Sequence, residues 1–331
     1  MFPKKPTIIL ALVGMLLFTG GAAWALEIVY PADKTFFTRS NFLIIKGGSE
    51  PPLQGITIAV DGVKSDIIDI GSPEYRAAFQ DFLILEPEFA PGKNVIQVEG
   101  FAGGKSVATA RAEVYYLDSD LTAQPPAGFK PFIMHRPETE AKCAPCHNMA
   151  PDKVEQQLTT AVGNPCASCH SRMLNRSHVH GPAGVYRCTY CHQADSRPNR
   201  YQPRNGDGRI CNECHIDKVK AFNANKFVHG PVAAGLCLVC HDPHASDNTA
   251  QLLAPVNTVC LNCHEEIGKS THVVRGVTGS GHPLEGVPDP SRPGDMLSCA
   301  SCHDPHGGSG QNFFRRGITS RFALCQLCHQ K

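Results

Sequence analysis

The sequence predicts two domains of different class: an all-β sandwich near the N-terminus, followed by a loop-rich, mainly irregular domain with short helices. Residues 27 to about 117 contain no cysteine or histidine, and they show short apolar runs separated by glycine and proline turns. The later part of the chain holds all 16 cysteines and all 16 histidines, and its apolar periodicity is poor. This contrast in composition is what predicts two domains.

Residues 1–25 have the organisation of a secretory signal peptide. Lys4 and Lys5 precede an apolar run over residues 8–18, and Ala23-Trp24-Ala25 fits the small-x-small cleavage pattern. The run is too short to span a bilayer comfortably, although an uncleaved anchor is the alternative. We therefore expect export to the periplasm, or beyond it to the outer surface, with a mature chain that begins near Leu26 and has no later transmembrane span.

Residues 26–118 are predicted to form the sandwich. The expected strands are Phe42–Ile45, Ile56–Val60, Ile67–Ile70, Phe79–Leu85, Asn94–Val98 and Ser106–Tyr116. The turns between them are marked by Gly47-Gly48, Asp61-Gly62, Pro91-Gly92 and Gly103-Gly104. The segment resembles bacterial immunoglobulin-like (Ig-like) domains in Tyr30-Pro31-Ala32-Asp33, in Pro91-Gly92-Lys93-Asn94 and in its final alternating strand.

A linker is expected over residues 119–134. Pro125-Pro126-Ala127-Gly128 lies at its centre, and such a stretch does not hold a helix or a central strand. The second domain is then expected over residues 135–331.

Every cysteine of the second domain belongs to a Cys-x-x-Cys-His pentapeptide. The eight motifs are Cys143, Cys146 and His147; Cys166, Cys169 and His170; Cys188, Cys191 and His192; Cys211, Cys214 and His215; Cys237, Cys240 and His241; Cys260, Cys263 and His264; Cys299, Cys302 and His303; and Cys325, Cys328 and His329. This is the attachment signature of c-type haem, in which two thiols form thioethers and the histidine becomes a ligand of the iron. Zinc ribbons and a disulfide framework are the alternatives, but neither needs a histidine after every second cysteine. The sequence thus predicts eight covalently attached haem c groups.

The number of histidines outside the motifs is the same as the number of predicted haem irons. They are His135, His178, His180, His229, His244, His272, His282 and His306. No histidine precedes His135 in the chain, so we expect all eight to be second iron ligands in bis-histidine centres. Met149, Met173 and Met296 are candidates to replace a histidine at one site, although we interpret them as core or loop residues.

The motifs repeat in pairs. The first cysteines of the paired motifs are Cys143 and Cys166, Cys188 and Cys211, Cys237 and Cys260, and Cys299 and Cys325. The separation is the same in the first three pairs and slightly longer in the fourth, which predicts four di-haem modules in tandem. His135, His180 and His229 each precede a module by eight residues, and the last two open the phrase His-Gly-Pro. In the third and fourth modules the first motif continues into His244 and His306 as His-Asp-Pro-His.

On these motifs the second domain resembles the doubled Cys-x-x-Cys-His family of multihaem c-type cytochromes. The resemblance implies that His180, His229, His244 and His306 are distal ligands. His135 has the spacing without the Gly-Pro, and His282 lies farther ahead of its module than this spacing requires. The first two modules lack the second histidine of His-x-Pro-His, and His178 and His272 are the candidates for the positions that remain.

Eight haems with two imidazoles each predict an electron carrier rather than an enzyme, because no iron position is left for substrate. The expected partners are other redox proteins of anaerobic respiration, namely cytochromes and quinol-oxidising or terminal reductase complexes, and self-association through either domain. The arginines between residues 172 and 209 are interpreted as partners of haem propionates, not of nucleic acid. An octahaem reductase of nitrogen or sulfur oxyanions and a subunit of a polymeric cytochrome filament are the alternative functions.

Overall fold

The computed structural model describes residues 26–38, 42–48, 52–117, 124–204, 206–273 and 281–329. The predicted signal peptide, residues 1–25, lies outside the described residues, as does part of the predicted linker. Within the described ranges, no helix is both long enough and apolar enough to cross a membrane.

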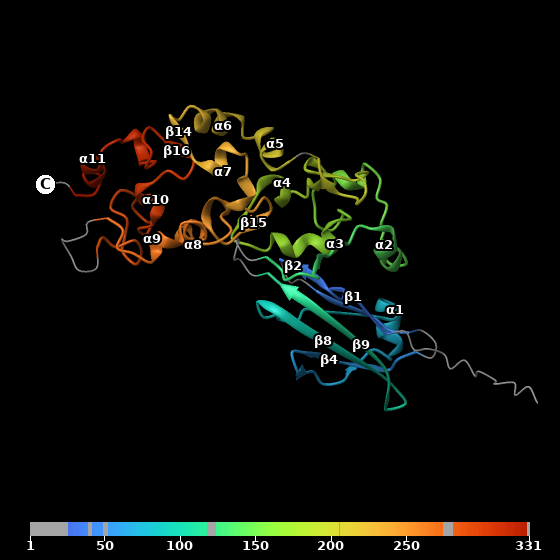
Figure 1. Cartoon of the computed structure of the whole chain (residues 1–331). Helices are drawn as coiled ribbons and strands as arrows, with labels where there is room; N and C mark the ends of the chain where they lie inside the picture. Colours follow the sequence, from blue (N-terminus) through green and yellow to red (C-terminus); the bar gives the residue numbers. More distant parts are fainter. Residues whose placement is uncertain are drawn as a thin grey trace, which may run out of the picture. The chain divides into compact units, whose positions relative to one another are not determined.

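The N-terminal part is a β-sandwich, as predicted (Figure 1). One sheet has the strand order β1-β3-β7, and the other has the order β10-β2-β9-β8-β4-β5, with β6 also paired to β4. The strands are β1 (Glu27–Tyr30), β2 (Thr35–Phe37), β3 (Leu43–Lys46), β4 (Gly55–Val60), β5 (Val63–Lys64), β6 (Ile68–Asp69), β7 (Phe82–Leu85), β8 (Gly92–Ala102), β9 (Lys105–Tyr116) and β10 (Lys130–Pro131).

Alternating apolar residues of both sheets form the core of the sandwich. Ile45 on β3, Ile56 on β4, Ile96 on β8 and Val114 on β9 are fully buried. The two-residue turn between β4 and β5 has positive φ at Asp61 (49°) and Gly62 (87°), which is the backbone that a tight hairpin requires. The period-2 burial on β8 and β9 is what the apolar alternation in the sequence predicted.

Two features of the sandwich differ from the sequence prediction. Residues Pro73–Phe79 form the helix α1, so Phe79 belongs to a helix and β7 begins only at Phe82. Ser72 caps this helix by accepting a hydrogen bond from the backbone of Tyr75 (3.1 Å), and Pro73 follows at the first helical position. The strands β1, β2, β5 and β10 were not predicted, because each is only two to four residues long, and β10 lies within the predicted linker.

The later part of the chain is loop-rich with short helices, as predicted (Figure 1). Its α-helices are α2 (Pro137–Cys143), α3 (Ala167–His170), α4 (Gly181–Gly184), α5 (Asp207–Asn212), α6 (Ile216–Asn223), α7 (Gly230–Ala233), α8 (Val256–Leu261), α9 (Glu265–Gly268), α10 (Cys299–Cys302) and α11 (Arg321–Cys325). Three two-stranded sheets connect its loops: β11 (His178–Val179) with β15 (Ala245–Ser246), β12 (His192–Gln193) with β13 (Gln202–Pro203), and β14 (Phe227–Val228) with β16 (Gly307–Gly308). The 3₁₀ turns are Glu155–Gln157, Ser171–Leu174, Cys188–Tyr190, Cys237–Val239, Thr249–Gln251 and Arg315–Gly317.

The chain divides into two compact units. Among the described residues, one unit comprises those within 26–33, 42–89 and 94–114, and the other comprises those within 34–38, 90–93 and 115–329. The domain boundaries that the sequence predicts at residues 118 and 134 stay predictions.

Candidate haem centres

Each Cys-x-x-Cys-His motif folds as a single helical turn. In seven of the eight motifs the backbone N–H of the histidine donates to the carbonyl of the first cysteine at 2.9–3.1 Å, while the Cys188 motif forms a 3₁₀ turn. Residues four apart lie on the same face of a helix. The turn therefore brings the first cysteine and the histidine of each motif to one side.

Seven of the eight motif histidines face a second histidine. The distance between ring centres is 6.0–6.3 Å in every pair. The pairs are His170 with His135, His192 with His244, His215 with His180, His241 with His306, His264 with His229, His303 with His272, and His329 with His282.

This spacing fits one metal ion between each pair of imidazoles. A bond from an imidazole nitrogen to a transition metal is about 2 Å long and the nitrogen lies roughly 1 Å from its ring centre, so two rings that share a metal have centres about 6 Å apart. Direct stacking of two aromatic rings does not require so uniform a distance. The residues of the motifs and their partners thus fit haem c, with the cysteines for the thioethers and the paired imidazoles for the iron.

Six of the seven pairs follow two rules of connection, and the pair of His303 with His272 follows neither. The histidine that precedes a module faces the second motif of the same module, as His180 faces His215 and His229 faces His264. The histidine of His-Asp-Pro-His faces the first motif of the preceding module instead, so His244 faces His192. His306 faces His241 in the same way, across the next boundary. The third and fourth modules therefore each complete a site in the module before them.

Backbone carbonyls orient many of these rings. The Nδ1 atoms of His192, His241 and His303 lie 2.7, 2.8 and 2.6 Å from carbonyl oxygens, each nine residues further along the chain. Those of His180 and His229 lie 2.9 Å from the carbonyls of Pro243 and Pro305. An imidazole that donates from Nδ1 keeps the lone pair of Nε2 for a metal, so these contacts select the ligating tautomer.

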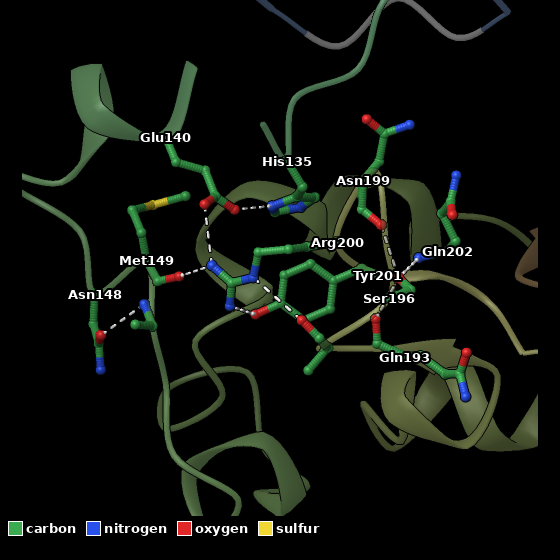
Figure 2. A network of polar contacts seen from close by, with 12 residues as sticks. His135, Glu140, Asn148, Met149, Gln193, Ser196, Asn199, Arg200, Tyr201 and Gln202 are labelled. Carbon is green, nitrogen blue, oxygen red and sulfur yellow. Dashed lines mark hydrogen bonds and ion pairs between the residues drawn. The ribbon is translucent and has the colours of Figure 1, made fainter. Parts of the chain in front are cut away.

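A carboxylate takes the place of the carbonyl at His135. Glu140 is buried, and it accepts from the Nδ1 of His135 and from the guanidinium of Arg200, both at 3.0 Å (Figure 2). Arg200 also donates to the carbonyl of Met149 at 2.7 Å and to the hydroxyl of Tyr201 at 2.9 Å. The network holds the His135 ring 6.0 Å from that of His170.

Burial keeps the inner histidines neutral. Burial, with the nearby His135, His192 and His244, lowers the pKa of His170 to about 4. Burial also lowers the pKa of His192, although its hydrogen bond to the carbonyl of Tyr201 opposes the shift. The neutral imidazole is the form that binds a metal, so metal ligation at these rings costs no deprotonation near neutral pH.

The cysteines bring consecutive motifs together along the chain. A side-chain hydrogen bond joins Cys166 to Cys188 across the first module boundary, and it lowers the pKa of the Cys188 thiol to about 7 and raises that of Cys166. Cys260 and Cys299 are joined in the same way across the last boundary. All sixteen cysteines lie within the described residues and none forms a disulfide, which contradicts the disulfide alternative.

Sequence reasoning missed the groups that orient the ligands. Glu140 lies five residues after His135, and Arg200 comes much later in the chain, so no local motif marks them. The Asp of each His-Asp-Pro-His was a detectable signal, since Asp242 and Asp304 accept from the backbone N–H of His244 and His306.

Three of the arginines that the sequence assigns to haem propionates also have partners within the protein. Arg176, Arg200 and Arg204 form ion pairs, and their partners are Asp247, Glu140 and Glu213. Two of these ion pairs, Arg176 with Asp247 and Arg200 with Glu140, connect segments that are distant in the chain. The assignment of the arginines to propionates stays a prediction.

His147 and His178 are the two predicted site residues that the structure does not bring to a partner ring. The ring contacts of the described residues include neither. His147 is exposed and His178 is half-buried on β11. Their ligand roles stay predictions.

The solved structures that are similar to this chain cover less than a third of it. A fibronectin(III)-like module of Clostridium thermocellum CbhA is 10% identical, with a TM-score of 0.22 over 28% of this chain and 98% of the module. The endo-β-1,4-mannanase of Thermotoga petrophila is 9% identical, with a TM-score of 0.23 over 29% of this chain and 20% of the mannanase. No curated protein matches the chain.

The later part of the chain matches a family model four times. The model is described as the doubled CXXCH motif, and it matches residues 135–175, 180–220, 229–269 and 290–331. These four segments coincide with the four modules that the motif spacing predicts. The chain therefore carries four doubled CXXCH motifs in tandem, the organisation of a multihaem c-type cytochrome with covalently bound haem c.

Proposed function

We propose that the protein is an exported electron-transfer protein of anaerobic respiration with eight c-type haems, acting in the periplasm or at the cell surface. The observation that carries this proposal is the set of seven facing histidine pairs, each centred 6.0–6.3 Å apart. Bound haem c supplies one-electron redox chemistry. The two imidazoles of each pair would hold one iron between them and leave no position on it for a substrate, which favours electron transfer over catalysis at those seven sites.

The proximity of consecutive Cys-x-x-Cys-His motifs supports electron transfer from haem to haem along the chain. Within modules, the second cysteines of both motifs are close enough for their charges to interact, as for Cys191 with Cys214 and Cys240 with Cys263. Across module boundaries, Cys166 contacts Cys188 and Cys260 contacts Cys299. At these four steps a motif thus has the next one as a near neighbour, which is the arrangement that electron transfer between centres requires.

The partners that suit this function are other redox proteins, namely cytochromes and quinol-oxidising or terminal reductase complexes. The β-sandwich contributes no cysteine and no histidine. We assign it the role of an Ig-like docking domain, for a partner protein or for a further copy of the chain.

Intact-mass measurement of the denatured, exported protein tests the haem content. We expect eight haems to remain covalently attached, one for each motif. Six or fewer, in a host with complete maturation machinery, would contradict the proposal.

Substitution of a distal histidine tests the ligand assignment. His229→Ala should convert one low-spin ferric centre to high-spin, because His264 loses the imidazole that faces it. His229→Met is the matched variant: a thioether should keep the centre low-spin and raise its reduction potential. An unchanged spectrum of His229→Ala would show that His229 is no ligand.

A further inference from the structure

Three modules share one loop structure after their first motif. Nine residues after the motif histidine, a carbonyl accepts from its Nδ1 at 2.7, 2.8 and 2.6 Å in the second, third and fourth modules. Eleven residues after it, the chain pairs back to the same histidine: His192 with Pro203, His241 with Leu252 and His303 with Phe314. The three loops therefore have the same length and close through the same contacts at their two ends.

When the three loops are aligned on the motif histidine, the distal ligand occupies the same position in two of them. Three residues after the motif histidine stand His244 in the third module and His306 in the fourth. Each faces the first motif of the module before it, with ring centres 6.1 Å apart for His192 and His244 and 6.3 Å apart for His241 and His306. The same position in the second module would serve the first motif of the first module, which is His147.

The residue at that position in the second module is Asp195. It is exposed, and its backbone carbonyl accepts from the guanidinium of Arg197 at 3.2 Å. A carboxylate is an anionic oxygen donor and not the neutral nitrogen donor that imidazole supplies, so Asp195 is not equivalent to His244 and His306 as a ligand. The module that should complete the His147 site thus offers a carboxylate instead.

The surroundings of His147 agree with this alignment. Among the histidines, all of which the structure describes, His147 and His178 are the two that face no other imidazole, and His147 is exposed. His178 lies on β11, and Phe227 stands at the corresponding place on β14. Because a phenylalanine stands at the corresponding position of the next module, comparison of the modules assigns no ligand role to His178.

We propose that the haem at the Cys143–His147 motif has a single protein imidazole, and that its second axial position, on the side of Asp195, takes a small exogenous ligand. Carbon monoxide is the probe for such a position. Asp195 supplies a hydrogen-bond acceptor there and Arg197 a donor on the same loop, so a small protic ligand is the natural occupant. The chain then combines seven centres for electron transfer with one that binds a ligand. This inference rests on the proposed haem content.

The experiment separates the two proposals by measuring haem content first. The full-length protein with eight haems, confirmed by intact mass, should show one high-spin iron in eight in the ferric state and bind about one carbon monoxide per chain when reduced. Fewer haems would contradict the proposed function. Eight haems with every iron low-spin and no binding of carbon monoxide would overturn only the present inference.

Asp195→His is the decisive variant. It places an imidazole at the position of His244 and His306, so the high-spin signal and the binding of carbon monoxide should both disappear. Gln193→His is the matched control, because it adds an exposed imidazole two residues away on the same loop and should leave both signals unchanged. A high-spin signal that persists in Asp195→His, at unchanged haem content, would show that position 195 does not correspond to the positions of His244 and His306.

Two further measurements, on the His178→Ala variant and on the diluted protein, would identify a protein ligand at the His147 site if the inference is wrong. We expect neither to change the spectrum. A new high-spin iron in His178→Ala would show that His178 serves the His147 site. A high-spin iron that emerges only on dilution would show that a second copy of the chain supplies the ligand. Either result overturns the proposal of an exogenous ligand.

Discussion

Glu140 shows how a single buried side chain distinguishes one centre from the others. It accepts from His135 and from Arg200 (Figure 2). In contrast, His180 and His229 donate to backbone carbonyls. A carboxylate acceptor makes an imidazole a stronger donor to a metal than a neutral carbonyl does. The centre that includes His135 and His170 should therefore favour the oxidised state more than its neighbours do.

Glu140→Gln should raise the reduction potential of this one centre. The amide keeps the shape and a hydrogen-bond acceptor, but it removes the charge that stabilises the oxidised site, and we expect a loss of about 1–3 kcal/mol in folding stability. A redox titration followed by absorption should show one of the eight transitions moved to higher potential, with the spectrum still low-spin at this centre. Glu138→Gln is the control, because Glu138 is exposed on the same helix. If both variants gave the same titration, Glu140 would have no influence on the potential.

At the scale of elements, the module boundaries depend on close backbone approach. A Cβ atom added to Gly208 on α5 would lie 2.7 Å from the carbonyl oxygen of Gly235, just before the 3₁₀ turn Cys237–Val239. This contact joins the second motif of the second module to the first motif of the third. Only glycine allows the two backbones to approach so closely.

Gly208→Ala should destabilise the chain by about 1–3 kcal/mol, because the methyl group overlaps the backbone of Gly235. Gly206→Ala is the control: nothing lies within 4 Å of the position of its Cβ, and it lies just two residues away. Chemical denaturation followed by circular dichroism would compare the midpoints. Equal midpoints for the two variants would mean that the boundary adjusts to the added methyl group.

Some strands and helices could be predicted from the sequence and others could not. The alternation along β8 and β9 is a local signal, and both strands were predicted. The helix α1 was missed because Phe79 extended an apolar run that continues into β7. The two-residue strands β11 and β14 carry no periodicity, and they exist because their partners β15 and β16 come from the module that follows in each case.

At the scale of the whole molecule, successive modules in the second part of the chain contact one another. His192 of the second module faces His244 of the third, and His241 of the third faces His306 of the fourth. Each boundary also carries a backbone contact, as where His180 donates to the carbonyl of His244 (2.9 Å) and His229 to that of His306 (3.2 Å). The modules are therefore expected to unfold together rather than one at a time.

Removal of the β-sandwich should leave the haem centres intact. A chain that begins at Gln124 retains every cysteine and histidine, and all seven facing pairs lie between His135 and His329. We expect eight haems and unchanged spectra and potentials, while electron delivery to the partner or assembly declines. Mass, absorption and redox titration of the shortened and the complete protein would test this. A loss of haem from the shortened chain would show that the predicted linker is no domain boundary.

The sequence by itself predicted which residues would attach haem, because the Cys-x-x-Cys-His motif is complete within five residues and one helical turn. It also determined the modular repeat and the change of class between the two parts of the chain. Which histidine faces which motif was decided only by the tertiary structure. The partners His192 and His244 are far apart in the sequence, and His244 serves the module before its own. The physical reason is that covalent attachment is a local geometry, whereas axial pairing and the buried network around Glu140 require loops from different modules to pack together.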